Sequence, residues 1–340
     1  MSCEALGLRL LSRVGDLLRR SSCDCVLFSG GIDTSFVTLA AVEAGLRPKL
    51  ITVLFQGSAD EPYAEYVSKV LGLDLIKVRP TPEEALECID VALRSMVTID
   101  PIEAVSGSAV CLGLRKAREL GCRCVATGDG GDELFIGYDF LFGRDRNYLD
   151  GWLSRVASSA FFNSVPISAQ LGVTVLLPLY SDDAKAISRE AFNEGCDVRD
   201  VNGTTYGKYL MRRVLELKGL SLVAWRRKDP ITRGSGSERL LGLMSSLVGD
   251  EEVRSLTSLT GVLVPSRPHA YLLGRRLSLR LPMPGKATRN LCPICGSELR
   301  DGFCRFCGAY IDEAGSLSVY SDDASNISGA SRLLSKGPKG

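Results

Sequence analysis

The sequence has no excess of either charge and no long apolar run. Its 340 residues include 41 Lys and Arg and 40 Asp and Glu, a formal net charge of +1, so the overall charge does not favour a polyanionic partner. No stretch reaches the roughly 18 consecutive apolar residues that a membrane-spanning helix needs. Residues 1–20 carry the acidic Glu4 and no long apolar core, which is typical of an amphipathic helix and not of a signal peptide. We therefore expect a cytoplasmic protein without a membrane partner.

Histidine is represented by His269 alone, whereas cysteine occurs 12 times. Four of the cysteines form two C-x-x-C pairs near the C-terminus and need an explanation of their own. The other eight are scattered, several of them in segments that resemble strands or core helices. In a reducing compartment, these eight are most simply small buried hydrophobic side chains.

Apolar segments alternate with helical patterns through the first part of the chain. The strand-like segments are 25–28, 50–55, 73–78 and 124–127, and the helix-like segments are 34–44, 63–71, 83–95 and 105–120. This alternation predicts an α/β fold, in which helices cover both faces of a parallel sheet. Such sheets bind ligands beyond the carboxyl ends of their strands. Two glycine-rich turns, after Phe28 and after Thr127, both fall at that edge.

We expect one large domain over residues 1–261, with a leading helix at 1–20 and a mostly helical half at 147–261. A basic, proline-containing linker is predicted at 262–290, because residues 267–290 include five Arg and one Lys but no Asp or Glu. A four-cysteine unit at 291–312 follows the linker. Residues 313–340 are rich in Ser, Gly and Asp, which predicts a disordered tail.

The first turn reads SGGIDTS over residues 29–35. Gly30 and Gly31 allow backbone N–H groups to approach a ligand closely, and the helix that follows points its positive end at the same place. Hydroxyl groups come from Ser29, Thr34 and Ser35. Asp33 is misplaced beside an anion unless a divalent cation such as Mg²⁺ lies between them. The turn therefore predicts a phosphate site with a bound cation.

The second turn reads GDGGDELFIGY over residues 128–138. Asp129, Asp132 and Glu133 place three carboxylates within five residues. Because like charges repel at this density, we expect a cation or a proton to be shared among them.

These turns carry a family resemblance. The first resembles the SGGxDS/T loop of the PP-loop ATP pyrophosphatases. The second is similar to the SGEGxDELFGGY motif of asparagine synthetases and their relatives, the β-lactam synthetases. A third match, with GKYLMRRVLE and LVAWRRKDPITRGSG at about 208–236, resembles the K…LR helix and the VAWRxK segment of the same family. The matches follow the family's order, and the resemblance covers roughly residues 22–237. It implies an ATP-dependent amide ligase that adenylylates a carboxylate, releases pyrophosphate and amidates the acyl-adenylate with ammonia.

The resemblance also implies roles for individual residues. Leu27 and Val53 would line the adenine pocket, and Thr127 and Gly128 would contact the adenosine end of ATP. Asp33 and Asp132 would hold Mg²⁺, Asp129 would act as the general base, and Lys228 would stabilise charge on the phosphates and the tetrahedral intermediate, as a fixed ammonium group can.

The acceptor half of the pattern is altered. Asp129 stands where the family usually has Glu, so the base is one methylene shorter, which matters for proton transfer over about 3 Å. The family's ExRxPFLD segment appears only as TVLLPLYSD, with Thr174 and Leu176 in place of Glu and Arg. Pro166 stands where a lysine is expected. Adenylylation is therefore better supported than aspartate as the acceptor.

Asparagine synthetases of the common type begin with a glutaminase domain, headed by a cysteine that removal of the first Met exposes. Here the phosphate loop begins at Ser29, and position 2 is Ser2, followed by Cys3. We expect ammonia to come from solution or from a separate glutaminase subunit.

The C-terminal cysteines read CPICGSELRDGFCRFCG. Thiolates at this spacing converge tetrahedrally on Zn²⁺, and the Gly after each pair allows a tight turn, as in a zinc ribbon or knuckle. The ligands would be Cys292, Cys295, Cys304 and Cys307. Four thiolates leave no open position, which predicts a structural role. With the basic linker, this unit is a candidate contact for RNA, for a partner subunit or for the chain's own core.

Two other functions stay open at this stage. One is tRNA sulfur transfer, since zinc modules also accompany PP-loops in that class, although GDGGDELFIGY belongs to the amide-forming branch. The other is a non-catalytic nucleotide-sensing or interaction protein. Asp33, Asp132 and Lys228 argue against the latter, because a site that has lost its activity has no reason to keep them.

Overall fold

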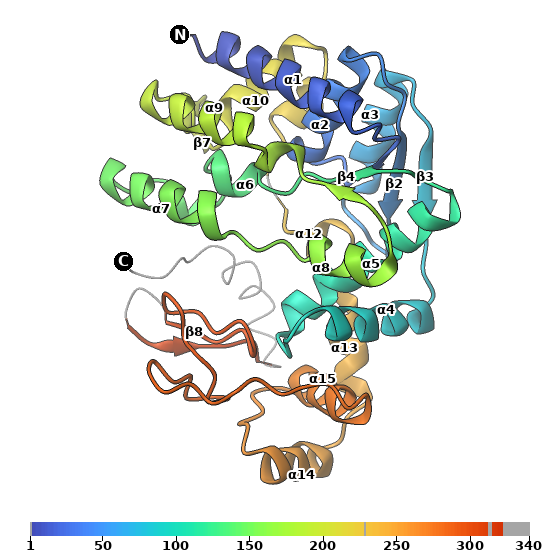
Figure 1. The fold of residues 1–340 in the computed structure, drawn as a ribbon, viewed down its shortest axis with the longest axis vertical. Helices are drawn as coiled ribbons and strands as arrows, with labels where there is room; N and C mark the ends of the chain where they lie inside the picture. The colour runs from blue at the N-terminus through green and yellow to red at the C-terminus, as the bar shows by residue number, and fades with distance from the viewer. Residues whose placement is uncertain (1, 228, 312–314, 322–340) are drawn as a thin grey trace.

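The computed structural model describes residues 2–227, 229–311 and 315–321, and its main sheet is parallel and five-stranded. The strand order is β3-β2-β1-β4-β5 (Figure 1). The strands are β1 Cys25–Leu27, β2 Lys49–Val53, β3 Leu75–Val78, β4 Val125–Ala126 and β5 Val175–Leu176. Val26 of β1 pairs with Leu50 on one side and with Ala126 on the other. The α/β prediction is confirmed.

Helices cover both faces of this sheet. Successive side chains of a strand point to opposite sides, so each strand contributes to two separate clusters. One face carries Cys25, Ile51 and Val125, and the opposite face carries Val26, Leu50 and Ala126. The first face packs on α4 Pro82–Ser95, α5 Pro101–Glu119 and α8 Ser164–Leu171. The second face packs on α1 Cys3–Arg20, α2 Ile32–Glu43, α3 Glu61–Leu71, α9 Asp182–Asn193 and α10 Tyr209–Leu217.

The amphipathic N-terminal helix predicted from the sequence is α1. Ser2 caps it by accepting a hydrogen bond from the N–H of Ala5 at 3.2 Å. Leu6, Leu10, Val14 and Leu18 are buried at helical spacing and belong to the cluster beneath the second sheet face.

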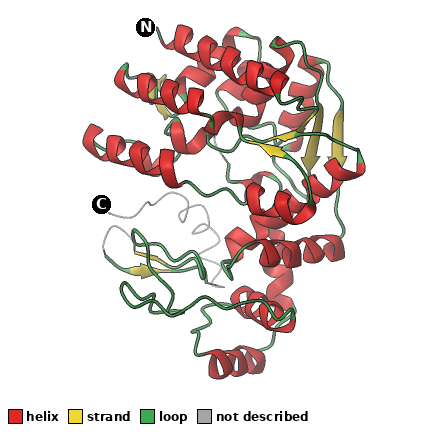
Figure 2. Ribbon diagram, viewed as in Figure 1, coloured by secondary structure: helices red, strands yellow, loops and turns green. Residues whose placement is uncertain are grey.

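Further helices and two small strand pairs complete the described chain. The remaining helices are α6 Gly131–Leu134, α7 Arg146–Ser159, α11 Ser221–Ala224, α12 Ile231–Gly234, α13 Arg239–Ser246, α14 Asp250–Thr260 and α15 Arg267–Ser278, with 3-10 turns at Asp139–Leu141 and Pro178–Tyr180. Two small antiparallel pairs join β6 Arg199–Val201 to β7 Thr204–Tyr206, and β8 Tyr310–Ile311 to β9 Leu317–Ser318. Figure 2 shows the main sheet among helices in the upper half of the molecule, and helices, loops and a short strand in the lower half. No helix among the described residues has the length and apolar character that crossing a membrane requires.

The segment predicted as a basic linker at 262–290 instead contains helix α15, which is packed into the core. Arg276 is 1% exposed and donates hydrogen bonds to the backbone oxygens of Leu93 and Met96. Arg275 pairs with Asp90, and Arg267 pairs with Asp250 at 2.8 Å. Three of the arginines that suggested an RNA contact therefore have partners within the chain.

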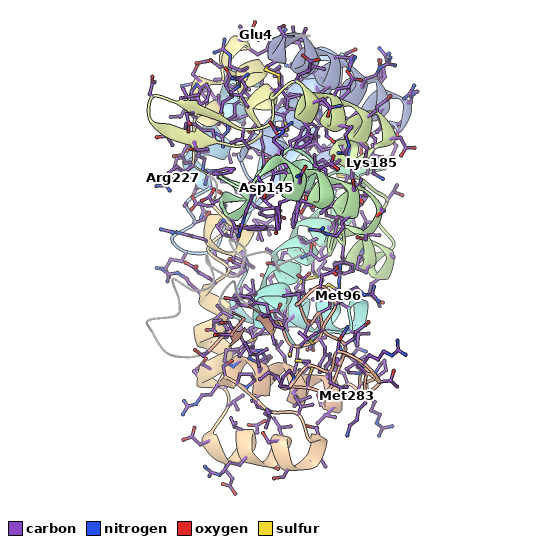
Figure 3. The ribbon with its side chains drawn as sticks, turned by 90° about the vertical axis from the view of Figure 1, so that its left-hand side faces the viewer. Glu4, Met96, Asp145, Lys185, Arg227 and Met283 are labelled. Carbon is purple, nitrogen blue, oxygen red and sulfur yellow. A yellow bond between two sulfur atoms is a disulfide. The ribbon has the colours of Figure 1, made fainter. Side chains whose placement is uncertain are left out.

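The four-cysteine module (residues 291–311) packs on this same half of the molecule. Cys292, Cys304, Phe306 and Cys307 belong to the hydrophobic cluster that also holds α4, α5, α13 and α15. Figure 3 shows the side chains of Met96 and Met283, both part of this cluster, in the lower half, far from Glu4 at the other end of the long axis. The predicted disordered tail at 313–340 lies largely outside the described residues, of which 315–321 contribute β9.

The eight scattered cysteines are not isolated hydrophobic side chains. They pair as Cys3–Cys196, Cys23–Cys124, Cys25–Cys122 and Cys88–Cys111. Six of the eight are buried in the core, as predicted, but the prediction missed their pairing, because pairing depends on which elements meet in the fold and sequence spacing does not reveal it. Two of the disulfides join the start of β1 to the start of β4, and Cys3–Cys196 ties α1 to the segment after α9.

Candidate active site

A pocket of about 240 Å³ opens at the carboxyl edge of the sheet, where both glycine-rich turns lie. Of the residues predicted for the nucleotide site, the pocket is lined by Leu27, Ser29, Gly31, Asp33, Thr34, Val53, Thr127, Gly128, Asp129 and Asp132. Gly30 and Ser35 do not line it. Ser35 is fully buried, and its Oγ has no hydrogen-bond partner among the described residues. The two turns therefore meet in one cavity, as their place in the fold predicts.

The first turn is shaped by its glycines and hydroxyls. Gly30 has a φ of +69°, and a Cβ there would lie 2.5 Å from the backbone N of Ala64, so only glycine fits. Ser29 Oγ accepts from the N–H of Gly31 at 3.2 Å and lies 3.2 Å from Thr34 Oγ1. Helix α2 begins directly after Gly31, so its positive end faces the pocket.

The second turn packs directly on the first. A Cβ at Gly131 would lie 2.2 Å from Asp33 Oδ1, and one at Gly128 would lie 2.9 Å from Asp33 Cβ. Only residues without a side chain allow this approach. The glycines of the second turn thus let its acidic residues converge with Asp33.

Asp33 and Asp132 converge on one buried cation, the ammonium group of Lys208. Its Nζ lies 2.5 Å from Asp33 Oδ2 and 2.8 Å from Asp132 Oδ1, and the Lys208 side chain is 2% exposed. Burial alone lowers the pKa of Lys208, but the attraction of Asp132 and Asp33 outweighs it and raises the pKa overall. The sequence prediction missed Lys208, although this lysine is the second residue of the GKYLMRRVLE match, and that match was the signal that could have found it.

Each of the three carboxylates of the second turn has a different hydrogen-bond or ion-pair partner among the described residues. Asp132 pairs with Lys208, and Glu133 accepts a hydrogen bond from Tyr138 Oη at 2.5 Å. Asp129 Oδ2 accepts from Thr127 Oγ1 at 2.9 Å and from Ser164 Oγ at 2.5 Å.

Asp129 has the surroundings of a proton acceptor. Burial raises the pKa of its carboxyl, while the hydroxyls of Ser164 and Thr127 oppose the rise. Glu133 likewise has a pKa raised to about 7, because it is buried and lies near Asp132. Glu133 does not line the pocket, whereas Asp129 does.

Arg226 brings a second cation to the pocket wall. Its Nη2 donates to Asp60 Oδ1 at 2.7 Å, and its guanidinium carbon lies 3.9 Å from the centroid of the Tyr63 ring. Burial raises the pKa of Asp60 to about 6, although Arg226 opposes the shift. Nη1 of Arg226 is buried and has no hydrogen-bond partner among the described residues. Arg226 is the first arginine of the VAWRRK match. The sequence prediction selected the lysine of that match, Lys228, which lies outside the described residues.

Residues 14–195, which hold both turns, match the model of a protein family described as asparagine synthase. The chain belongs to the asparagine synthase family. It is 23% identical to asparagine synthetase B [glutamine-hydrolyzing] of Escherichia coli over 303 residues, covering 77% of this chain and 51% of that protein. It is 29% identical to asparagine synthetase [glutamine-hydrolyzing] 2 of Lotus japonicus over 123 residues, 33% of this chain and 21% of that one. The chain spans about half the length of the first relative and less of the second.

Two solved structures show weaker likeness. One is a predicted subunit of a tRNA methyltransferase from Methanocaldococcus jannaschii, with a TM-score of 0.30 and 19% identity over 59% of this chain and 90% of that one. The other is NMN synthetase from Francisella tularensis, with a TM-score of 0.31 and 15% identity over 68% of this chain and 98% of that one. Scores of this size carry no argument about function.

The altered acceptor segment, residues 174–182, contains strand β5 and the 3-10 turn Pro178–Tyr180. Leu176 lies in β5 and pairs with Ala126 of β4, so an aliphatic side chain occupies the position of the family's arginine. Thr174 is exposed, just before the strand. Neither residue lines the pocket.

The four cysteine Sγ atoms lie close enough together to hold one metal ion. All four Sγ atoms lie within 4.8 Å of one another, with Cys292 and Cys307 at 3.6 Å and Cys295 and Cys304 at 3.5 Å. Tetrahedral Zn²⁺ with Zn–S bonds of about 2.3 Å needs Sγ atoms about 3.8 Å apart, so the cluster fits the ion. His269 is not part of the cluster. Its Nε2 lies 2.9 Å from the backbone oxygen of Cys307 and holds the second pair of cysteines on α15.

Proposed function

We propose that this chain is an ATP-dependent amide ligase that adenylylates a substrate carboxylate and amidates it with ammonia. The observation that carries the proposal is that the two family turns meet at one pocket, where Asp33, Asp132 and Asp129 lie together. Aspartate is the acceptor that we propose, which would give asparagine, AMP and pyrophosphate. Ammonia would come from solution or from a separate glutaminase subunit.

The pocket suits the triphosphate of ATP. The positive end of α2, the Ser29 and Thr34 hydroxyls and the backbone of Gly31 surround the first turn. Arg226 Nη1, a buried donor without a partner among the described residues, would bind a phosphate oxygen. Leu27 and Val53 supply apolar walls, which suit an adenine ring.

The carboxylates of Asp33 and Asp132 fit a divalent cation. Both supply hard oxygen ligands, and the single positive charge of Lys208 offsets only one of their two negative charges. Mg²⁺ at this place would neutralise phosphate charge and polarise the α-phosphate. Lys208 and Arg226 would offset the charge that develops as pyrophosphate leaves, and so would Lys228 of the sequence prediction.

Two bond changes complete the reaction. A carboxylate oxygen of the acceptor attacks the α-phosphorus, and the bond to the β-phosphate oxygen breaks. The nitrogen of ammonia then attacks the acyl carbon, and the bond to the AMP oxygen breaks. Asp129 would take the proton that the nitrogen loses, since its carboxyl lies in the pocket with a raised pKa and two hydroxyl groups to orient it.

The test is pyrophosphate release from Mg²⁺–ATP with ammonium and L-aspartate, with mass spectrometry for asparagine and AMP. We expect wild type to form both products and Asp129→Asn, which keeps the size of the side chain, to lose amidation by about 10²- to 10⁴-fold. Asp139→Asn is a matched control, because Asp139 lies outside this pocket. Pyrophosphate release with tRNA and not with a small carboxylate would replace the amide-ligase proposal with RNA modification. ATP binding without turnover would support a nucleotide sensor.

A further inference from the structure

A second cavity, of about 460 Å³, adjoins the candidate active site. The hairpin of β6 and β7, helix α10 and the segment after α11 all contribute to its wall. The lining side chains with polar groups are those of Asp139, Thr204, Thr205, Tyr206, Arg212 and Arg227. Arg227 also lines the candidate active site, whereas Asp129, the proposed base, lines the candidate active site alone. The two cavities therefore share the side chain of Arg227 as a common wall.

The shared wall lies at the phosphate end of the candidate active site. The N–H of Arg212 donates to the backbone oxygen of Lys208 at 3.1 Å, so these residues are one turn apart at the start of α10. Lys208 binds Asp33 of the first glycine-rich turn, which would hold the phosphates. Nη1 of Arg212 donates to the backbone oxygen of Arg226 at 3.0 Å. Arg212 thus ties the start of α10 to the segment that carries Arg226 and Arg227.

The guanidinium group of Arg212 is fixed in place with one nitrogen unused. Arg212 is 4% exposed, and its guanidinium carbon lies 4.6 Å from the centroid of the Tyr206 ring. Nε donates to the backbone oxygen of Gly207 at 2.8 Å, and Nη1 donates to those of Ala224 and Arg226. Nη2 forms no hydrogen bond with a described residue, so it remains for a ligand in the cavity. Burial lowers the pKa of Arg212 to about 10, so the group keeps its charge at pH 7.

The charges of the lining favour an anion with more than one charged group. Arg227 supplies a second guanidinium group, which forms no hydrogen bond or ion pair with a described residue. The hydroxyl of Thr204 adds a donor, whereas that of Thr205 already donates to Asp200. The acid in the lining is Asp139, and the two guanidinium groups outweigh its single charge. A monocarboxylate would meet one guanidinium group, whereas inorganic pyrophosphate has a phosphate group for each.

We propose that the second cavity binds inorganic pyrophosphate as it leaves the phosphate end of the candidate active site, with one phosphate group on Arg212 and the other on Arg227. The inference rests on the proposed function. No bond changes in this step, because the ion moves past the shared wall and exchanges the cations beside the first turn for the two guanidinium groups. The family motif VAWRxK leaves the position of Arg227 open, so the site does not follow from the family resemblance.

Calorimetry on the full chain tests the site, with inorganic pyrophosphate as the probe. The candidate active site is first filled with Mg²⁺ and α,β-methylene ATP, in which the bond that the reaction breaks cannot be cleaved. We expect wild type to bind one pyrophosphate in addition to the analogue. Arg227→Met should weaken this binding about 10- to 100-fold, the effect of losing a charge-assisted hydrogen bond. Thr204→Asp adds a negative charge to the second cavity alone. It should weaken pyrophosphate binding about 10-fold or more and leave the Kd of the analogue within about twofold of wild type.

Arg233→Met is the matched control. Arg233 is 62% exposed, its Nε lies 3.8 Å from Asp229 Oδ1, and it lines neither cavity. This variant should bind pyrophosphate like wild type. The unfolding temperature of each variant shows whether it is folded.

The outcomes separate the two proposals. Weaker pyrophosphate binding by Arg227→Met and Thr204→Asp supports the inference, even if wild type releases no pyrophosphate from ATP, a result that would contradict only the ligase proposal. Pyrophosphate that no longer binds once the analogue is present would overturn the inference, because both ligands would then compete for the candidate active site. Equal pyrophosphate binding by wild type and Thr204→Asp overturns it with or without the analogue. L-aspartate that displaces pyrophosphate at equal concentration would overturn the pyrophosphate assignment in favour of a carboxylate site.

Discussion

Replacing Lys208 with Met removes the cation between Asp33 and Asp132 and leaves an unbranched side chain only one atom shorter. At 2.8 Å and an effective dielectric constant of about 20, one such pair attracts by about 6 kcal/mol before the cost of desolvation is subtracted. Lys208 is 2% exposed, and the carboxylates are 18% and 19% exposed, so water replaces little of the lost interaction. Breaking a buried pair of this kind costs about 3–5 kcal/mol, and we expect a loss of stability of that size.

Urea unfolding at pH 7 measures this loss, with Lys116→Met as the control. Lys116 pairs with Glu119 at the surface, where an ion pair contributes about 1 kcal/mol at most. Mg²⁺ should stabilise Lys208→Met more than it stabilises wild type, because the two carboxylates then lack their internal cation. A loss below about 1 kcal/mol, or an equal response of both proteins to Mg²⁺, would refute the assignment of Lys208 as the partner of the cation site.

Two further predictions concern stability. Burial raises the pKa of Glu103 to about 7 in the folded chain, so the folded state binds the carboxyl proton more tightly than the unfolded state does. The contribution of Glu103 to the free energy of unfolding therefore falls as pH rises from about 4.5 to 7, by about 3 kcal/mol at most. Urea unfolding of Glu103→Gln at several pH values should lack this fall, and an unchanged pH slope would contradict the burial of the charge. The Cys3–Cys196 disulfide spans 193 residues, for which chain entropy gives about 5 kcal/mol, and measured effects are typically about 2–4 kcal/mol. Under oxidising conditions, the double variant Cys3→Ser, Cys196→Ser should have a free energy of unfolding lower by about 2–4 kcal/mol, measured with urea. In reductant, its stability should match that of wild type. Equal stability of the two proteins without reductant would show that the bond does not form.

Features that depend on local pattern were predicted from the sequence. The alternation of apolar segments with helical segments was enough to predict the α/β sheet. Each strand contributes side chains to both faces, and therefore its sequence is apolar along most of its length. The two glycine-rich turns follow strands β1 and β4, which are neighbours in a parallel sheet, so their meeting at one edge follows from topology.

Features that depend on distant pairs were not predicted. Lys208 contacts Asp33 across 175 residues, and Arg226 contacts Asp60 across 166 residues. Likewise, the arginine-rich stretch was predicted to be a linker. Nothing local shows that Arg276 donates hydrogen bonds to the backbone oxygens of Leu93 and Met96 at the end of α4. The disulfides belong to the same class. Such contacts are fixed by packing, to which one sequence gives no direct access.

The most direct measurement follows the acceptor's oxygen. L-aspartate labelled with ¹⁸O in its side-chain carboxylate is incubated with the protein, Mg²⁺–ATP and ammonium, and the AMP formed is analysed by mass spectrometry. If the carboxylate attacks the α-phosphorus, each AMP carries one ¹⁸O atom and asparagine keeps the other. Unlabelled AMP, or formation of ADP and phosphate, would contradict the acyl-adenylate at the centre of this account.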